Sequence, residues 1–280
     1  SEIPGQFPED PALLRPGILT CEYAENPHGI DVSDPELSWT VISGKRNQVQ
    51  LAYELIVSDN IPDISNFTGN AWKTGKIISS QTLHVRYSGS PLKSFTRYYW
   101  RVKVYDKNGQ GSPWSDIAWF ETAMLSEKDW KASWIGDGKP QFTRDEDFYG
   151  DDPMPIFRKS FNTGRKVASA RLYISGLGYY EAYLNGKKAG DRSLDPGWFS
   201  YQKHVPYSVY DITSLLKDGP LVCGIMLGNG WYNILPLRMW GNLNLRQYLA
   251  IGRPCVKAEI RLNYADGTSE VIATDGSWLT

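Results

Sequence analysis

Apolar and polar residues alternate over short stretches of this chain, a pattern typical of β-strands with one buried face. Trp100, Val102 and Val104 form one such apolar face. The pair Asn108-Gly109, a strong signal for a tight hairpin turn, follows shortly afterwards. Similar strands and turns recur every ~8–12 residues, which predicts an antiparallel sandwich of about seven strands. We place this sandwich at residues 14–124, after an N-terminal extension over residues 1–13.

A second strand-rich region spans residues 154–280. It contains the pair Asn185-Gly186, which predicts a second hairpin turn. Eight or so strands separated by long excursions suit a jelly-roll β-sandwich. No stretch has the length or period of a crossover helix. The predicted fold class is therefore all-β: an immunoglobulin-like sandwich followed by a jelly roll.

The pattern also specifies burial within two of these strands. Leu51 begins a series of apolar residues spaced two apart that continues to Val57; this series should share the buried face, with Ala52 facing outwards. The run Leu221–Leu227 is apolar throughout, so we expect it to be buried on both faces.

Residues 125–153, between the two regions, lose the alternation and are expected to form a linker. Ser126 is placed to cap a single helical turn, with Asp129 at its third position. Five acidic residues then cluster within eight positions: Asp145, Glu146, Asp147, Asp151 and Asp152. Their spacing is not that of a calcium-binding loop, and a solvated surface loop at the domain junction is the favoured interpretation.

Composition narrows the function classes. The 280 residues suffice for two domains, and a net charge of −1 gives no basic surplus for nucleic acid. No apolar run is long enough for a membrane span, and no secretion signal is expected within this numbering. The chain has 11 Trp and 17 Tyr against 9 Phe. Such an excess is common in sugar-handling proteins, although a β-rich protein alone would also favour Trp and Tyr.

The three cysteines argue against both a disulfide framework and a zinc site. Their number is odd, and none lies in a Cys-x-x-Cys motif. Cys223 and Cys255 lie in apolar runs, where a small buried side chain is the default. Cysteine usage leaves the compartment open; of the alternatives, a periplasmic or extracellular location is favoured.

Several segments, taken in order, resemble the N-terminal region of bacterial α-L-rhamnosidases, glycoside hydrolase family 78. In the second region they are GYYEAYLNG (178–186), LDPGWFSY (194–201), YDIT (210–213) and LGNGWY (227–232). In the first region, PELSW (35–39), WKTGK (72–76) and YWRV (99–102) resemble the family's fibronectin type III-like module. Together the resemblance covers nearly the whole chain.

The resemblance implies that these residues belong to an enzyme whose active site lies elsewhere. In the family a later (α/α)6 barrel carries the two carboxylates of an inverting glycoside hydrolase. This chain has no long amphipathic helices for such a barrel, so no catalytic residue is assigned. The implied function is the non-catalytic N-terminal part of an enzyme that hydrolyses terminal α-L-rhamnose from glycans or glycosides. The alternatives are a free-standing carbohydrate-binding module and a purely structural adaptor.

The resemblance also implies candidate binding residues in the second region. Some relatives bind L-rhamnose through calcium, and Glu181 and Asn229 offer oxygen ligands for that ion. The further candidates for sugar binding are Asp195, Trp198, Trp231 and Tyr232. The alternative is that the polar residues cap turns and the aromatic rings pack under loops.

Two further features of the sequence bear on catalysis and on partner binding. Glu181 and Asp195 form the one candidate carboxylate pair, although a sandwich surface encloses a distorted sugar poorly. The apolar excursion Asn233–Trp240 has no helical or strand period. Such a loop often docks on another surface. By the resemblance, that surface is the rim of the catalytic barrel of the same polypeptide.

Overall fold

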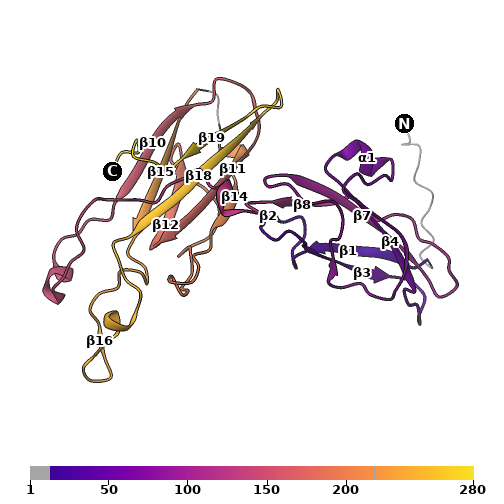
Figure 1. Ribbon diagram of the computed structural model, residues 1–280, viewed down its shortest axis with the longest axis horizontal. Helices are drawn as coiled ribbons and strands as arrows, with labels where there is room; N and C mark the ends of the chain where they lie inside the picture. Colours follow the sequence, from indigo (N-terminus) through magenta and orange to yellow (C-terminus); the bar gives the residue numbers. More distant parts are fainter. Residues whose placement is uncertain (1–12, 217–218) are drawn as a thin grey trace. The chain divides into compact units, whose positions relative to one another are not determined.

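The computed structural model describes residues 13–216 and 219–280, which form two compact units divided between Asp129 and Trp130 (Figure 1). Each unit is a β-sandwich with its own apolar core, which confirms the predicted all-β fold class. The expected N-terminal extension lies, except for its last residue, outside the described residues. No helix in the described part of the chain is long and apolar enough to cross a membrane.

The first unit consists of a three-stranded and a five-stranded sheet. The first sheet has the order β1 (Arg15–Cys21), β3 (Glu36–Ile42), β6 (Val85–Arg86). The second has the order β2 (His28–Ile30), β8 (Ala118–Thr122), β7 (Arg97–Tyr105), β4 (Ala52–Ser58), β5 (Trp72–Ile78). Two helical turns complete the unit: α1 (Ile61–Ser65) and η1 (Glu127–Asp129).

The core of the first unit confirms the alternation in β7 but corrects the burial expected for β4. Trp100, Val102 and Val104 are fully buried. Leu51, by contrast, precedes the strand and is 46% exposed, whereas Ala52 is buried. Helix α1 packs on β4, so this strand is covered on both faces.

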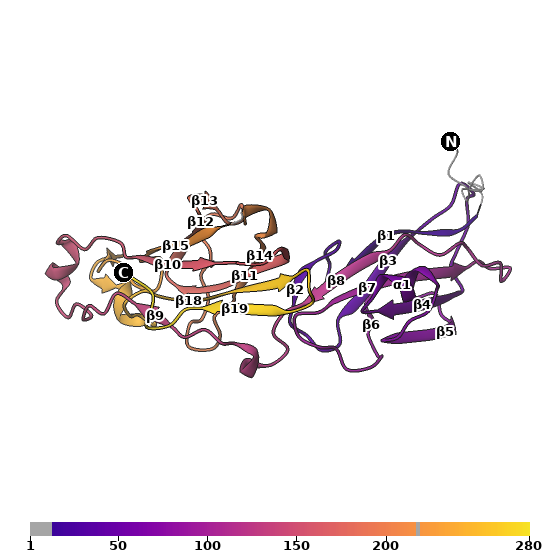
Figure 2. The ribbon, with the colours of Figure 1, turned by 90° about the horizontal axis from the view of Figure 1, so that it is seen from above.

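The second unit stacks two antiparallel sheets, seen as separate layers in Figure 2. One has the order β10 (Ile156–Asn162), β15 (Pro220–Gly228), β12 (Tyr179–Leu184), β13 (Lys187–Lys188). The other has the order β14 (Ser208–Asp211), β11 (Val167–Leu177), β18 (Cys255–Tyr264), β19 (Ser269–Ala273), and β9 (Ile135–Gly136) also pairs with β18. The smaller elements are η2 (Asp145–Tyr149), η3 (Thr213–Leu215), β16 (Arg238–Met239), β17 (Leu243–Asn244) and η4 (Leu245–Tyr248).

In the second unit, the hairpin turn forms where the sequence predicts it, but β15 is not buried in the way predicted. Asn185 and Gly186 both have positive φ, as a tight hairpin turn between β12 and β13 requires. Strand β15 alternates between buried and half-buried residues, so the expectation of burial on both faces was wrong. Only one face of its sheet is covered by the other sheet.

The helical turn at η1 forms as expected. The Asp129 carboxylate accepts the Ser126 backbone N–H at 3.0 Å, and the Ser126 hydroxyl accepts the Lys128 N–H at 3.3 Å. The Asp129 carboxylate also accepts the Ser94 hydroxyl at 2.6 Å, which ties this turn to the first sandwich.

The segment after Asp129 is part of the second unit, whereas the sequence suggested a linker over 125–153. Its β9 extends the sheet at β18. The fully buried Glu259 carboxylate accepts the backbone N–H groups of Lys131 and Ala132 at 2.8 and 3.3 Å. The acidic cluster forms η2 within this same unit.

Candidate functional site

Three loop segments of the second unit, 137–153, 190–204 and 229–253, contact one another and are called here the loop end. The first and third project beyond the strands at the same end of the sandwich (Figures 1 and 2). The Tyr149 hydroxyl donates to the Pro236 carbonyl oxygen at 3.3 Å. The ring of Trp198 stacks on that of Trp231, with ring centroids 4.6 Å apart.

Arg246 supports the third segment from inside. It is buried, and its guanidinium donates to the Ile234 carbonyl at 2.5 Å and to Asn233 Oδ1 at 3.1 Å. The same guanidinium lies 3.9 Å from the ring centre of Phe148, which belongs to the first segment. A buried arginine therefore links two loops that are distant in sequence.

Arg253 makes a second link between these segments. Its guanidinium pairs with Asp137 and, at 2.6 Å, with Asp152. The hydrogen bond from Arg253 holds the pKa of the Asp152 carboxyl below its usual value, although partial burial opposes the shift. Sequence reasoning missed both arginines, since nothing in their local pattern indicates such distant partners.

The predicted sugar ligand Asp195 lies inside the sandwich. It is 9% exposed, and its Oδ2 accepts hydrogen bonds from the hydroxyls of Tyr180, Ser208 and Tyr210 at 2.5–2.6 Å. Burial, together with the bond to Asp195, raises the pKa of Tyr210 to about 12. Asp195 thus joins its loop to β12 and β14, a position unsuited to direct contact with a sugar.

Glu181 lies on the outer face of β12 and is paired within the protein. Its Oε1 accepts from Lys188 Nζ at 2.6 Å and its Oε2 from the Tyr183 hydroxyl at 2.5 Å. These two hydrogen bonds, that of Lys188 first, lower the pKa of the Glu181 carboxyl. The carboxylate is therefore ionised and already neutralised by a neighbouring lysine.

Asn229 does not meet Glu181. Glu181 pairs with Met226 across the sheet, and Asn229 lies three residues further along, about 10 Å at 3.3 Å per residue. The Asn229 side-chain oxygen accepts from the buried Asn233 at 2.8 Å, so it caps its own turn. Gly230, at φ +51°, packs its backbone against Gly178.

These residues do not fit the calcium site that the resemblance implies. Both oxygens of Glu181 and that of Asn229 are engaged by protein donors. Over residues 13–216 and 219–280, no three His, Cys, Asp or Glu side chains gather as metal ligands. Three residues of the acidic cluster are instead paired within the protein: Asp145 with Asn244, Asp147 with Arg144, and Asp152 with Lys139 and Arg253.

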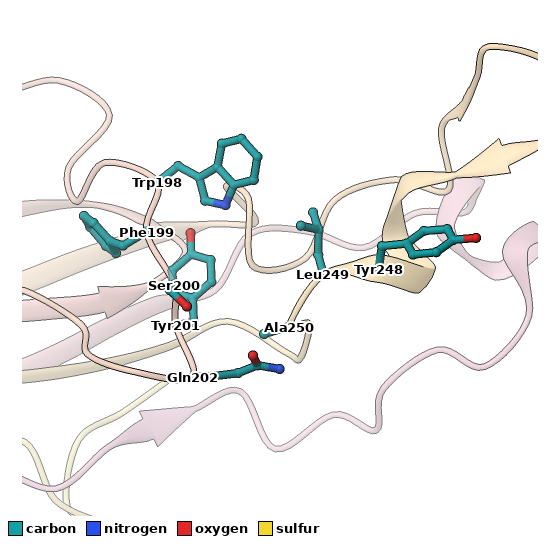
Figure 3. Close-up of a pocket in the computed structure, with 8 residues that line it drawn as sticks. All are labelled: Trp198, Phe199, Ser200, Tyr201, Gln202, Tyr248, Leu249 and Ala250. Carbon is teal, nitrogen blue, oxygen red and sulfur yellow. The ribbon is translucent and has the colours of Figure 1, made fainter.

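The aromatic candidates do come together. Trp198 is 53% exposed and stacks nearly parallel, at 14°, on the half-buried Trp231. Tyr232 packs edge-on against Tyr201, with centroids 5.2 Å apart. A cavity of about 300 Å³ opens beside this group, between the segment 198–202 and residues 248–250 (Figure 3).

Comparison with known proteins matches each unit to a known domain family. Residues 16–126 match the model of the Rha78A-like N-terminal immunoglobulin domain, and residues 165–280 match that of the α-L-rhamnosidase N-terminal domain. An α-L-rhamnosidase of Formosa agariphila is 37% identical over 270 residues, covering 90% of this chain and 28% of that protein. One from an Alteromonas species is 31% identical over 273 residues, with 96% and 28% covered.

A solved structure is similar to both units. The α-L-rhamnosidase from Dictyoglumus thermophilum superposes with a TM-score of 0.83 at 36% identity, covering 94% of this chain and 29% of that one. This chain thus spans about 28% of the length of the curated relatives it matches. Because both units match, the chain belongs to the α-L-rhamnosidase family through its two N-terminal domains.

Proposed function

We propose that this chain is the non-catalytic N-terminal portion of an α-L-rhamnosidase, an enzyme that hydrolyses terminal α-L-rhamnose from glycans or glycosides. The observation that carries the proposal is the match of both units, in this order, to N-terminal domains of such enzymes. The relatives of 31–37% identity have most of their length outside the matched region. The catalytic machinery belongs to that remainder.

The position of the two candidate carboxylates supports a non-catalytic role. Hydrolysis of a glycosidic bond needs two carboxyl groups about 5–9.5 Å apart on either side of the sugar. Successive side chains of β12 alternate between faces, so Tyr180 points inwards to Asp195 while Glu181 points outwards. Glu181 and Asp195 therefore lie on opposite faces of the sheet and cannot flank one substrate.

The remaining partner in this proposal is the catalytic barrel of the same polypeptide. The excursion after Gly230 exposes three large apolar side chains, Leu235, Leu237 and Trp240, the last of them 84% exposed. Exposed apolar groups gathered on one loop are typical of a contact surface. The segment 235–240 that carries them is called here the docking loop. Its three exposed side chains would pack on the rim of the barrel.

Activity of the isolated chain tests the first part of the proposal. The purified 280-residue chain should release no aglycone from an aryl α-L-rhamnoside, whereas the polypeptide encoded by the complete reading frame should. Turnover by the isolated chain above a denatured control would contradict the proposal. A reading frame without a long helical region downstream would favour the free-standing binding module.

The docking loop has its own test in the complete polypeptide. Trp240→Ala should shorten the half-life of activity on heating, because the barrel loses an apolar contact. Tyr23→Ala, which removes another exposed aromatic ring from the first unit, should leave that half-life unchanged. Equal half-lives for Trp240→Ala and the unsubstituted enzyme would remove the docking loop from the proposal.

A further inference from the structure

The first unit has a pocket at the seam where its two sheets end. Strand β5 is the last strand of the five-stranded sheet, and β6 is the last of the three-stranded sheet. Residues of both strands line a cavity of about 400 Å³, a volume at the small end of ligand pockets. Val85 of β6 is buried, whereas Lys73 of β5 and Arg86 of β6 are exposed. The pocket is therefore apolar inside and cationic at its mouth.

Tyr53, from the neighbouring strand β4, supplies a polar group at the inner end of this pocket. It is 7% exposed and lines the cavity, and its hydroxyl forms no hydrogen bond with any described residue. Trp39 packs edge-on against the Tyr53 ring, with centroids 5.1 Å apart, and the Trp39 indole donates to the buried Gln50 at 2.9 Å. Burial raises the pKa of Tyr53, so its hydroxyl stays a donor at neutral pH. This fixed hydroxyl is therefore available to a molecule in the cavity.

The mouth of the pocket carries positive charge that the protein neutralises only in part. Arg86 pairs with Asp34 at 3.2 Å and with Glu36 at 3.3 Å. Lys73, by contrast, forms no ion pair within residues 13–216 and 219–280. The described residues that line the cavity include no acidic side chain. A carboxylate entering at the mouth would therefore meet Lys73 with no acidic group of the pocket wall to oppose it.

The middle of the pocket suits a flat apolar body. Ile77 of β5 and Val85 of β6 line it from the two opposing sheets. Trp72 adds an aromatic wall, and its ring lies edge-on against that of Tyr87, with centroids 5.3 Å apart. An aromatic ring packs well against aliphatic and aromatic walls of this kind.

We propose that this pocket binds a small aromatic carboxylate that carries a hydroxyl at the opposite end of its ring. The carboxylate pairs with Lys73 at the mouth, the ring lies between Ile77 and Val85, and the ligand hydroxyl meets that of Tyr53. All these residues belong to the first unit, so the site does not depend on the function proposed above.

Titration of the 280-residue chain with 4-hydroxybenzoate, followed by two-dimensional NMR, tests this site. Signals of Ile77 and Val85 should shift with a millimolar dissociation constant, as is typical of a ligand with few atoms. Lys73→Gln should weaken binding about threefold, because the carboxylate loses its cation. Lys103→Gln removes a lysine of the same sheet that lies outside the pocket, and it should bind as the unsubstituted chain does.

Two ligands and two proteins isolate the hydroxyl contact. Benzoate lacks the ligand hydroxyl and should bind the unsubstituted chain several-fold more weakly than 4-hydroxybenzoate does. Tyr53→Phe keeps the ring and loses only the oxygen, so it should abolish this preference and leave the affinity for benzoate unchanged. Tyr105→Phe removes a hydroxyl that donates to Glu54 outside the pocket, and it should preserve the preference.

Two results would overturn the site. One is the absence of any shift at Ile77 and Val85 with tens of millimolar 4-hydroxybenzoate, and the other is an undiminished preference for this ligand in Tyr53→Phe. If Tyr53→Phe loses its dispersed spectrum, the unsubstituted chain still decides, because equal affinities for the two ligands would exclude the hydroxyl contact. None of these measurements uses enzymatic activity, so failure of the site leaves the N-terminal role standing.

Discussion

At the scale of single residues, Asp195 explains how the loop that carries Trp198 keeps its position. One carboxylate oxygen accepts three hydroxyls, from Tyr180, Ser208 and Tyr210, that come from two strands. The Asp195 backbone carbonyl also accepts the Tyr180 N–H at 2.9 Å. Charge-assisted hydrogen bonds of this kind are the strong ones in a low-dielectric interior. Asp195 is thus a positioning residue for the aromatic group.

Asp195→Ala should destabilise the second unit by about 2–3 kcal/mol, because the buried hydroxyls of Tyr180 and Ser208 and the half-buried hydroxyl of Tyr210 lose their shared acceptor. Urea unfolding measures this loss, and near-ultraviolet circular dichroism should show a weaker signal from the Trp198–Trp231 pair. Asp191→Ala, an exposed substitution in the same loop, should stay within about 0.5 kcal/mol of the unsubstituted chain. Similar losses for the two variants would show that the hydroxyl cluster contributes little.

At the scale of elements, two long loops are held together by charge as well as by apolar contact. Arg253 is 101 residues from Asp152 and 116 from Asp137 in sequence, yet it pairs with both. The arginine side chain is largely buried, so solvent screens these pairs only partly. Removing one charged side chain from such a cluster leaves the opposite charges of its partners without compensation.

Arg253→Met should loosen the segment 137–153, since Asp137 and Asp152 lose the buried guanidinium that joins them and Asp152 keeps only the exposed Lys139. Proteolysis within this segment should then become several-fold faster, while cleavage in the first unit stays the same. Arg144→Met removes an arginine that pairs with Asp147 on the exposed surface, and it should change little. Equal cleavage rates for both variants would mean that other contacts hold the loop.

The same arginine predicts a pH dependence. The pKa of Asp152 is lower in the folded chain than its ordinary value near 4, so the unfolded state binds more protons in acid. The contribution of the Arg253–Asp152 pair to the free energy of unfolding is complete at pH values above the ordinary pKa. It is lost as the pH falls through the lowered pKa of the folded chain. The difference in urea midpoint between the unsubstituted chain and Arg253→Met should therefore shrink from pH 7 to pH 3. A difference that stays constant would contradict the ion pair's role.

The strands could be predicted from sequence because their burial follows a local period of two. Trp100 and its neighbours in β7 obey it on every second residue. Ala52 does not, since β4 is buried on both faces, and the five-residue helix α1 that packs on this strand has too few positions to show a period. The sequence indicated Trp198 and Trp231 only as separate candidates for sugar binding, and it did not predict that their rings stack. Arg246 and Arg253 depend on partners in another loop, which no local pattern specifies.

At the scale of the whole molecule, the boundary between the units decides which fragments will fold. Glu259 is fully buried, and one of its oxygens accepts the backbone N–H groups of Lys131 and Ala132. The second unit therefore begins near Trp130 rather than at the start of β10. Strand β9 would also be missing from a later start.

A fragment of residues 130–280 should unfold cooperatively, whereas one of residues 154–280 should be less stable by about 2 kcal/mol or more, because one oxygen of the buried Glu259 carboxylate loses two backbone donors and only the other keeps its pairing with Arg261. Thermal unfolding of the two fragments measures the difference. A parallel pair, 14–129 and 14–124, removes only η1 and should differ less. Equal stability of 130–280 and 154–280 would place the boundary after the acidic cluster.

The buried cysteines give each unit an internal reporter of its own opening. Cys21 lies in the first core and Cys223 in the second, and burial raises the pKa of both thiols, that of Cys223 to about 12. Alkylating reagents attack the thiolate, so neither sulfur reacts until its sandwich opens. Mass spectrometry of pulse-alkylated chains would therefore time the opening of the two units separately, with no substitution introduced.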